Sequence, residues 1–231
     1  MNAKDLKSKL LEIRDNGFID SRRKGNTGVG YTLESLLGID ENNDASADIN
    51  DLIELKAKRK DGSARVTSFC QSFIWLKDKR KIILEYGNKI SDERINFYVS
   101  LRNGLKSPRG LELFIENESV FIINEKKEKI AELPVEVIVF RFRQKFNELV
   151  LVTAENKKER GKPESFWYNE AYHCQDLNKE SILNLLNEGK ITFETRIWFN
   201  PQSGKIRDRG TAVRLTDKWT KQLFNKVDKI L

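Results

Sequence analysis

The sequence is poor in the residues that build zinc and thiol sites. It has two cysteines that lie far apart, Cys70 and Cys174, no CxxC motif, and a single histidine, His173. A structural zinc site takes four Cys or His ligands, so these three residues exclude one. No sequence context supports an activated Cys–His nucleophile either. We expect both cysteines to be unpaired, which suits a reducing cytoplasm.

Long apolar runs are also missing. No stretch approaches the roughly 18 apolar residues that span a membrane. The N-terminus reads as an amphipathic helix and not as a signal peptide, with an apolar stripe that ends before Asn16-Gly17. The stripe consists of Leu6, Leu10, Leu11 and Ile13. No internal repeat or low-complexity tract is present.

The charge balance favours a polyanionic partner. Lys and Arg number 42 against 35 Asp and Glu, a formal net charge of +7. The 39% share of hydrophobic residues indicates a folded globule and not a basic tail. A length of 231 residues suits one domain of two closely packed lobes.

Helix-like and strand-like segments are mixed along the chain, with several consecutive strands, which predicts an α+β or mixed α/β fold. After the N-terminal helix, we expect helices at 31–37, 133–146, 181–186 and 216–230. We expect strands at 51–58, 65–69, 81–86, 95–101, 111–115, 120–124, 149–153 and 191–199. Residues 40–47 form an acidic, Asn-rich loop, and 157–164 form a charged loop.

A basic, glycine-rich segment, SRRKGNTGVG, covers residues 21–30. It is not a P-loop, because no Gly-Lys-Ser/Thr closes it, and no strand precedes it as a dinucleotide fingerprint requires. Glycines at a helix start expose N–H groups that bind phosphate, and three cations come just before them. A DNA backbone phosphate is therefore the ligand we expect. The alternative is that the glycines only make a tight turn.

The segment 46–58, SADINDLIELKAK, carries the clearest chemistry. On a strand, Glu54 and Lys56 lie on the same face. Asp48 and Glu54 together offer oxygen ligands to a hard cation such as Mg²⁺. Lys56 beside them is suited to orient or deprotonate a water, which is the chemistry of metal-dependent phosphodiester hydrolysis. The spacing resembles the Asp…Glu-x-Lys signature of PD-(D/E)xK nucleases. The alternative is a solvated strand that carries ordinary surface charges.

Glu34 lies on a predicted helix otherwise built of leucines, just upstream of the candidate metal strand. A carboxylate beside an apolar face needs a partner, and the cation or Lys56 would supply one. Periodicity alone also allows a surface glutamate.

Two blocks resemble one family. RRKGNTGVGYTLESLLG followed by SADINDLIELKAK resembles the N-terminal half of the MvaI/BcnI-type restriction endonucleases, relatives of the MutH mismatch-repair nicking enzyme. Near the C-terminus, KIRDRGTAVRL at 205–215 resembles the family segment Lys-x-His-Asp/Asn-His-Gly-Thr-Ala-Phe-Arg. Thr195-Arg196-Ile197 also resembles a family strand.

The resemblance implies a catalytic centre of Asp48, Glu54 and Lys56, with Glu34 as the supporting helical glutamate. Asp51 competes with Asp48, but it is only three residues from Glu54, too close for a hairpin to turn between them. The family pattern also implies a PD-(D/E)xK core with two lobes around a DNA cleft. The catalytic lobe would centre on 20–100, and the recognition elements would include 190–215.

The C-terminal block departs from the family because arginines, Arg207 and Arg209, replace its histidines. Arginine reads guanine bidentately in the major groove, although plain phosphate contact is the alternative. The expected DNA-binding residues are Arg22, Arg23, Lys24, Asn26, Thr27, Arg196, Arg207, Asp208 and Arg209.

The resemblance thus predicts a site-specific, Mg²⁺-dependent double-stranded DNA endonuclease of type II. It would work as a monomer that cuts one strand after the other, with Mn²⁺ able to substitute and Ca²⁺ supporting binding without cleavage. A cognate methyltransferase would be a genetic and not a physical partner. The alternatives are a MutH-like nicking or repair endonuclease and an inactive DNA-binding protein of the same fold.

Overall fold

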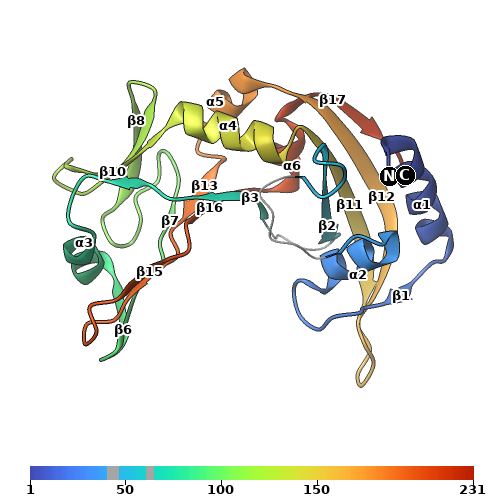
Figure 1. Cartoon of the computed structure of the whole chain (residues 1–231), viewed down its shortest axis with the longest axis horizontal. Helices are drawn as coiled ribbons and strands as arrows, with labels where there is room; N and C mark the ends of the chain where they lie inside the picture. Colours follow the sequence, from blue (N-terminus) through green and yellow to red (C-terminus); the bar gives the residue numbers. More distant parts are fainter. Residues whose placement is uncertain (41–46, 61–64) are drawn as a thin grey trace. The chain divides into compact units, whose positions relative to one another are not determined.

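The computed structural model describes residues 1–40, 47–60 and 65–231, so most of the expected acidic loop at 40–47 lies outside the described residues. The chain divides into two units (Figure 1). Unit 1 comprises Met1–Ala64, Arg143–Asn178 and Thr216–Leu231, and unit 2 comprises Arg65–Phe142 and Lys179–Leu215. Asp48, Glu54 and Lys56 therefore belong to unit 1, whereas 190–215 and also 65–100 belong to unit 2.

Unit 1 is built on one mixed sheet. Its strand order is β1-β12-β11-β2, and β17 pairs with β12 further along the same strand. The β2–β11 pair is parallel and the other pairs are antiparallel. The strands are β1 (Ile19–Asp20), β2 (Ile53–Arg59), β11 (Glu148–Lys157), β12 (Ser165–Leu177) and β17 (Phe224–Lys229).

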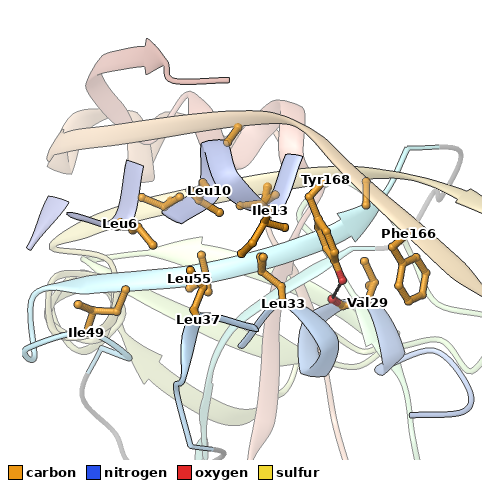
Figure 2. Close-up of a cluster of buried hydrophobic side chains, with 14 of the residues drawn as sticks. Leu6, Leu10, Ile13, Val29, Leu33, Leu37, Ile49, Leu55, Phe166 and Tyr168 are labelled. Atoms are coloured by element: carbon orange, nitrogen blue, oxygen red, sulfur yellow. Dashed lines mark hydrogen bonds between the residues drawn. The ribbon is translucent and has the colours of Figure 1, made fainter. Parts of the chain in front are cut away.

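Helices α1 (Ala3–Asp15) and α2 (Gly28–Leu37) supply the apolar cover of this sheet. The expected stripe of α1 is confirmed for Leu6, Leu10 and Ile13, which are buried at helical spacing. Figure 2 shows them packed with Leu33 of α2 and Leu55 of β2. Residues from both chain ends, Met1, Ile230 and Leu231, pack against this core.

Buried Tyr168 of β12 joins the sheet to α2 through a polar contact inside this core. Its hydroxyl donates to the carbonyl of Val29 at 2.8 Å, drawn in Figure 2. A buried hydroxyl needs such a partner, so this bond fixes the start of α2 against the sheet.

Helix α2 begins at Gly28, three residues before the predicted start. It ends where predicted, at Gly38, whose φ of 72° is the left-handed conformation of a helix C-cap. Gly28 also permits a close approach, since a Cβ there would lie 2.5 Å from the carbonyl oxygen of Arg23 and 2.7 Å from Oγ of Ser21.

Unit 2 contains three four-stranded sheets, ordered β4-β10-β9-β8, β3-β16-β13-β7 and β15-β14-β6-β5. The strands of the first are β4 (Ile74–Trp75), β8 (Glu112–Glu116), β9 (Ser119–Ile123) and β10 (Lys129–Pro134). Those of the second are β3 (Val66–Gln71), β7 (Ser100–Leu101), β13 (Thr192–Glu194) and β16 (Thr211–Leu215). Those of the third are β5 (Asn88–Ser91), β6 (Arg94–Phe97), β14 (Ile197–Phe199) and β15 (Ile206–Asp208).

The remaining helices are α3 (Lys79–Tyr86), α4 (Val135–Lys145), α5 (Lys179–Asn187) and α6 (Asp217–Lys221). The predicted helices at 133–146 and 181–186 are confirmed as α4 and α5. Together the helices and sheets confirm the predicted α+β class. No described helix has the length and apolar character needed to cross a membrane.

Two predicted elements are wrong. The predicted strand at 81–86 is helix α3, which starts where Asp78 accepts the N–H of Lys81 at 3.0 Å and buries Ile82 and Ile83. The predicted helix at 216–230 is the short α6 followed by strand β17, because the edge of β12 offers backbone partners along Tyr172–Leu177. Both cysteines are free, as expected.

We expect Gly28→Ala to lower the free energy of unfolding by about 1–3 kcal/mol, because the new methyl group collides with backbone. Gly30→Ala is the matched control, since the nearest atom to a Cβ there is 3.8 Å away. Alanine favours a helix over glycine by up to about 1 kcal/mol, so the control variant should be neutral or stabilised. Urea unfolding of the two variants checks this, and equal stabilities would contradict it.

Candidate functional site

A tight turn at residues 49–52 brings Asp48 back onto the start of β2. The N–H of Leu52 donates to the carbonyl of Ile49 at 3.0 Å, and the central residues Asn50 and Asp51 have φ of 50° and 55°. Positive φ at both central positions is typical of a type I′ hairpin turn. Oδ2 of Asp48 then accepts the N–H of Leu55 at 2.9 Å. Asp51, the alternative to Asp48, sits exposed at the tip of the turn.

Strand alternation separates the apolar and charged side chains of β2. Ile53 and Leu55 point into the core of unit 1, so Glu54 and Lys56 share the opposite face. Nζ of Lys56 donates to Oε1 of Glu54, whose side chain is 0% exposed, while that of Lys56 is 29% exposed. The structure therefore brings Asp48, Glu54 and Lys56 together, as the motif predicts.

A second lysine, which the sequence motifs do not predict, completes this cluster. Nζ of Lys145, in the last turn of α4, lies 2.9 Å from Oε2 of Glu54 and is 17% exposed. Oε2 accepts no hydrogen bond with good geometry, so this contact is an ion pair. No local signal marks Lys145, because it is far from Glu54 in the sequence and ends an ordinary amphipathic helix.

The surroundings of Glu54 act on its ionisation in opposite directions. Burial raises the pKa of Glu54 above its ordinary value, the ammonium of Lys56 opposes the rise, and the carboxylate of Asp48 adds to it. Lys145 also lowers the pKa. Two carboxylates that repel each other inside a protein are stabilised by a cation between them.

The donor set can be compared with the needs of a divalent cation. No group of three or more Cys, His, Asp or Glu side chains gathers as a metal site within the described ranges. Mg²⁺, however, is usually held by one or two carboxylates while it keeps several waters and takes oxygens from its substrate. Asp48 and Glu54 supply those two carboxylates, and the buried Oε2 of Glu54 accepts no hydrogen bond.

Glu34 is half-buried on α2, with Oε1 on the side of Gly30, where a Cβ would lie 3.8 Å from it. The contacts described for Asp48, Glu54 and Lys56 do not involve it, so its supporting role stays a prediction.

The glycine-rich segment forms the loop that leads into α2. The N–H of Arg22 donates to Oγ1 of Thr32 at 2.9 Å, and the guanidinium of Arg23 stacks 3.7 Å above the ring centroid of Tyr31. Thr27 is the N-cap residue of α2, but its side chain makes no capping bond. The tight-turn alternative is supported at Gly25, whose φ of 87° is left-handed, whereas a Cβ would be crowded at Gly28 and free at Gly30.

The four predicted C-terminal DNA contacts differ in how their side chains are engaged. Arg196 donates to the carbonyls of Gly210 and Arg209 at 3.1 and 2.7 Å and to Sγ of Cys70 at 2.8 Å. Asp208 accepts from Nζ of Lys79 at 3.1 Å and from the N–H of Gly210 at 2.8 Å. Both therefore fix the shape of the loop after β15.

Arg207 and Arg209, by contrast, are exposed. A pocket of about 320 Å³ in unit 2 includes Arg209 together with Arg196, Arg214 and the exposed ring of Tyr98.

Solved structures share this fold. The structure "Restriction endonuclease MvaI-cognate DNA substrate complex" superposes with a TM-score of 0.81 at 22% identity over 100% of both chains. "Restriction endonuclease MvaI in the absence of DNA" gives a TM-score of 0.60 at 20% identity over 100% of this chain and 99% of that one. The fold is thus that of a restriction endonuclease.

The sequence comparison identifies the family within this class of protein. The model of the MvaI/BcnI restriction endonuclease family matches residues 7–224, and the chain belongs to that family. No curated protein matches it in sequence. The resemblance seen in the two sequence blocks is therefore confirmed, and it extends across the middle of the chain.

We expect Lys145→Met to lower the free energy of unfolding by about 1–3 kcal/mol in the absence of divalent cations, because a buried carboxylate loses a partner. The loss should grow with pH. Without Lys145 the pKa of Glu54 in the folded protein rises further. When the folded-state pKa of a carboxyl is raised, the free energy of unfolding falls as the pH climbs above the pKa of that group in the unfolded chain.

Urea unfolding at pH 5 and pH 8 with a chelator checks this. Lys145→Arg, which keeps the positive charge, is the control and should lose less. A loss that is independent of pH would show that Lys145 contributes packing alone.

Proposed function

We propose that this chain is a Mg²⁺-dependent endonuclease of type II that cuts double-stranded DNA at a specific sequence. The observation that carries the proposal is the cluster in which Asp48 returns onto Leu55 of β2, next to Glu54 and Lys56 on one face of that strand. The MvaI structure that shares the fold is a complex with a cognate DNA substrate, which supports DNA as the substrate class.

The side chains of the cluster have distinct proposed roles. Asp48 and Glu54 hold the cation, which when bound polarises the scissile phosphate and lowers the pKa of a water. Lys56 orients that water, or takes a proton from it, on the exposed side of β2. Lys145 keeps Glu54 ionised and in place, and Glu34 supports the group from α2.

Metal and cell context complete the proposal. Mn²⁺ substitutes for Mg²⁺, whereas Ca²⁺ supports DNA binding without cleavage. The protein acts as a monomer in a bacterial or archaeal cytoplasm. A methyltransferase that modifies the same sequence is its genetic partner.

We expect Asp48→Ala, Glu54→Ala and Lys56→Ala each to abolish plasmid cleavage, because each removes a cation ligand or the group beside the water. Binding to cognate duplex in Ca²⁺ should persist for Lys56→Ala. Asp51→Ala is the matched control, since Asp51 lies at the tip of the same turn, and it should cut at the wild-type rate. Cleavage of a plasmid panel with end sequencing gives both the site and the rates. Full activity of Asp48→Ala would refute the assignment of Asp48 as a cation ligand.

A single active site must visit the two DNA strands in turn. We therefore expect nicked circles to accumulate before linear plasmid appears, and sedimentation to show a monomer at the same protein concentration. Nicked circles that never become linear would indicate a MutH-like nicking enzyme. Linear product without a nicked intermediate, formed by a stable dimer, would contradict the monomer.

Base readout is proposed for Arg207 and Arg209, the exposed arginines at β15. We expect Arg209→Ala to cost about 1–3 kcal/mol of discrimination at one base pair and to change binding to unrelated DNA much less. The measurement is binding to cognate and scrambled duplexes across a salt series. Equal weakening on both duplexes would make Arg209 a backbone contact.

A further inference from the structure

Unit 1 contains a cation-lined pocket of about 830 Å³ at the far end of β2 from Glu54. We call it the basic pocket, and it is lined by residues 21–26, Arg59, Lys158 and 161–164. One wall is the loop before α2. The other is the tip of the β11–β12 hairpin, which projects beyond the sheet of unit 1 (Figure 1).

The charge of the lining is strongly one-sided. Six of its side chains are Lys or Arg: Arg22, Arg23, Lys24, Arg59, Lys158 and Lys162. The single lining carboxylate is Glu164. Arg59 donates a hydrogen bond of 2.7 Å to each of its two oxygens, so its charge is already paired. Hydrogen bonds from Arg59 hold the pKa of Glu164 below its ordinary value. Lys24 and Lys158 make no ion pair with any residue that the structure describes.

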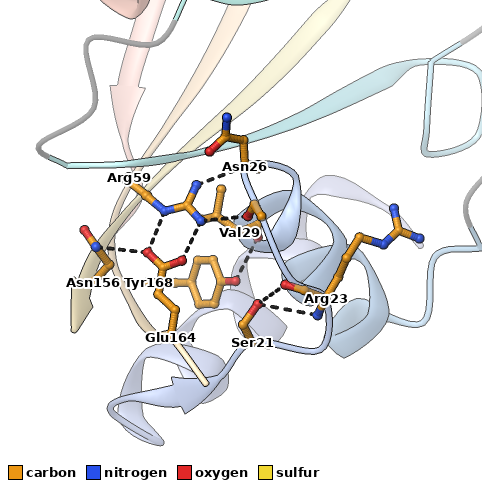
Figure 3. A network of polar contacts seen from close by, with 9 residues as sticks. Ser21, Arg23, Asn26, Val29, Arg59, Asn156, Glu164 and Tyr168 are labelled. Carbon is orange, nitrogen blue, oxygen red and sulfur yellow. Dashed lines mark hydrogen bonds and ion pairs between the residues drawn. The ribbon is translucent and has the colours of Figure 1, made fainter. Parts of the chain in front are cut away.

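A network of hydrogen bonds and ion pairs, shown in Figure 3, connects the two walls of the basic pocket. Besides Glu164, Arg59 donates to the carbonyls of Asn26 and Gly25 at 3.0 and 3.1 Å. Asn156 donates to Glu164 at 3.0 Å, and the N–H of Ser21 donates to the Glu164 carbonyl at 2.7 Å. Chain segments far apart in sequence are thus held as one preorganised surface, so binding an anion there costs little reordering.

The lining chemistry indicates which part of a nucleic acid fits. No aromatic side chain lines the basic pocket, so it offers no platform for stacking a base. Lysine and arginine without base-reading partners contact phosphates, and such contacts position DNA without reading its sequence.

Its place on the strand indicates which phosphates these are. Measured along β2, Glu54 and Arg59 are five residues apart, roughly 16 Å at about 3.3 Å per residue, and Arg59 leaves the strand on the face of Leu55, where its guanidinium lies over the ring of Phe166. Phosphates advance about 3.4 Å per nucleotide along a DNA strand, so this span corresponds to roughly five base pairs.

We propose that the basic pocket is a clamp for the DNA backbone outside the recognition sequence, with the β11–β12 hairpin tip as its second arm. This inference rests on the proposed function, since it takes the substrate to be duplex DNA. Its readout is the dependence of binding on the length of DNA that flanks the site.

The test compares Lys24→Ala/Lys158→Ala with wild type on two cognate duplexes in Ca²⁺. One duplex has about ten flanking base pairs on each side and the other about two, which is too short to reach the basic pocket. Lys4→Ala/Lys7→Ala is the control, because it removes the same charge from exposed positions on α1 of the same unit. Thermal unfolding verifies that all variants fold.

We expect the wild type and the control to bind the long duplex more tightly than the short one. The Lys24/Lys158 variant should lose that gain, and its salt slope on the long duplex should fall by about 1.8, at about 0.9 for each lost phosphate contact. An equal loss on both duplexes, or a loss no larger than that of the control, would overturn the clamp.

A small phosphate anion shares the chemistry of the backbone, and inorganic phosphate is the probe that separates the two. If phosphate stabilises the wild type but not the Lys24/Lys158 variant, while flank length has no effect, the pocket binds free anions and the clamp is wrong. The proposed function is scored separately by plasmid cleavage. A plasmid that is cut without any flank effect refutes only the clamp, and a flank effect without cleavage refutes only the nuclease.

Discussion

The burial of one carboxylate, that of Glu54, is the constraint on which the proposed active site depends. A carboxylate away from water is costly unless cations or hydrogen bonds compensate it. Here an ammonium meets each oxygen, Lys56 from the same strand and Lys145 from α4. The tight turn that returns Asp48 to Leu55 adds a second negative charge to the same place. Glu54 and Lys56 stand on β2, which pairs with β11 from Ile53 to Arg59 and packs its other face into the core, so their geometry is held by pairing and packing.

The sequence predicted what is encoded locally. Asp48, Glu54 and Lys56 are close in sequence, and strand periodicity alone places the last two on one face. The end of α1 before Asn16-Gly17, the C-cap at Gly38 and the glycine-rich loop also follow from short-range rules. Lys145 and Arg59 could not be found in this way, because their roles come from partners on other segments.

The two wrongly predicted elements, at 216–230 and 81–86, have the same cause, which is that the deciding contacts lie outside the segments themselves. Strand β17 exposes every residue except Phe224 and is held to β12 through its backbone, so its sequence carries no alternation of buried and exposed positions. Its charges then resemble an amphipathic helix. The run of apolar residues in α3 resembled a strand because its helix signal, the cap at Asp78, lies just outside the run. Tertiary pairing and capping decided these segments, and intrinsic propensity did not.

The parallel pairing of β2 with β11 has a consequence for the order in which the protein matures during synthesis. Glu54 leaves the ribosome early, but Leu149, its register partner on β11, and Lys145 follow only after all of Arg65–Phe142 has been made. Pairing between such distant segments is slow and comes after local structure. A nascent chain therefore carries the proposed metal-binding carboxylates well before it can organise them. The proposed nuclease site is therefore complete only when translation is well past the middle of the chain, and shorter copies do not contain it.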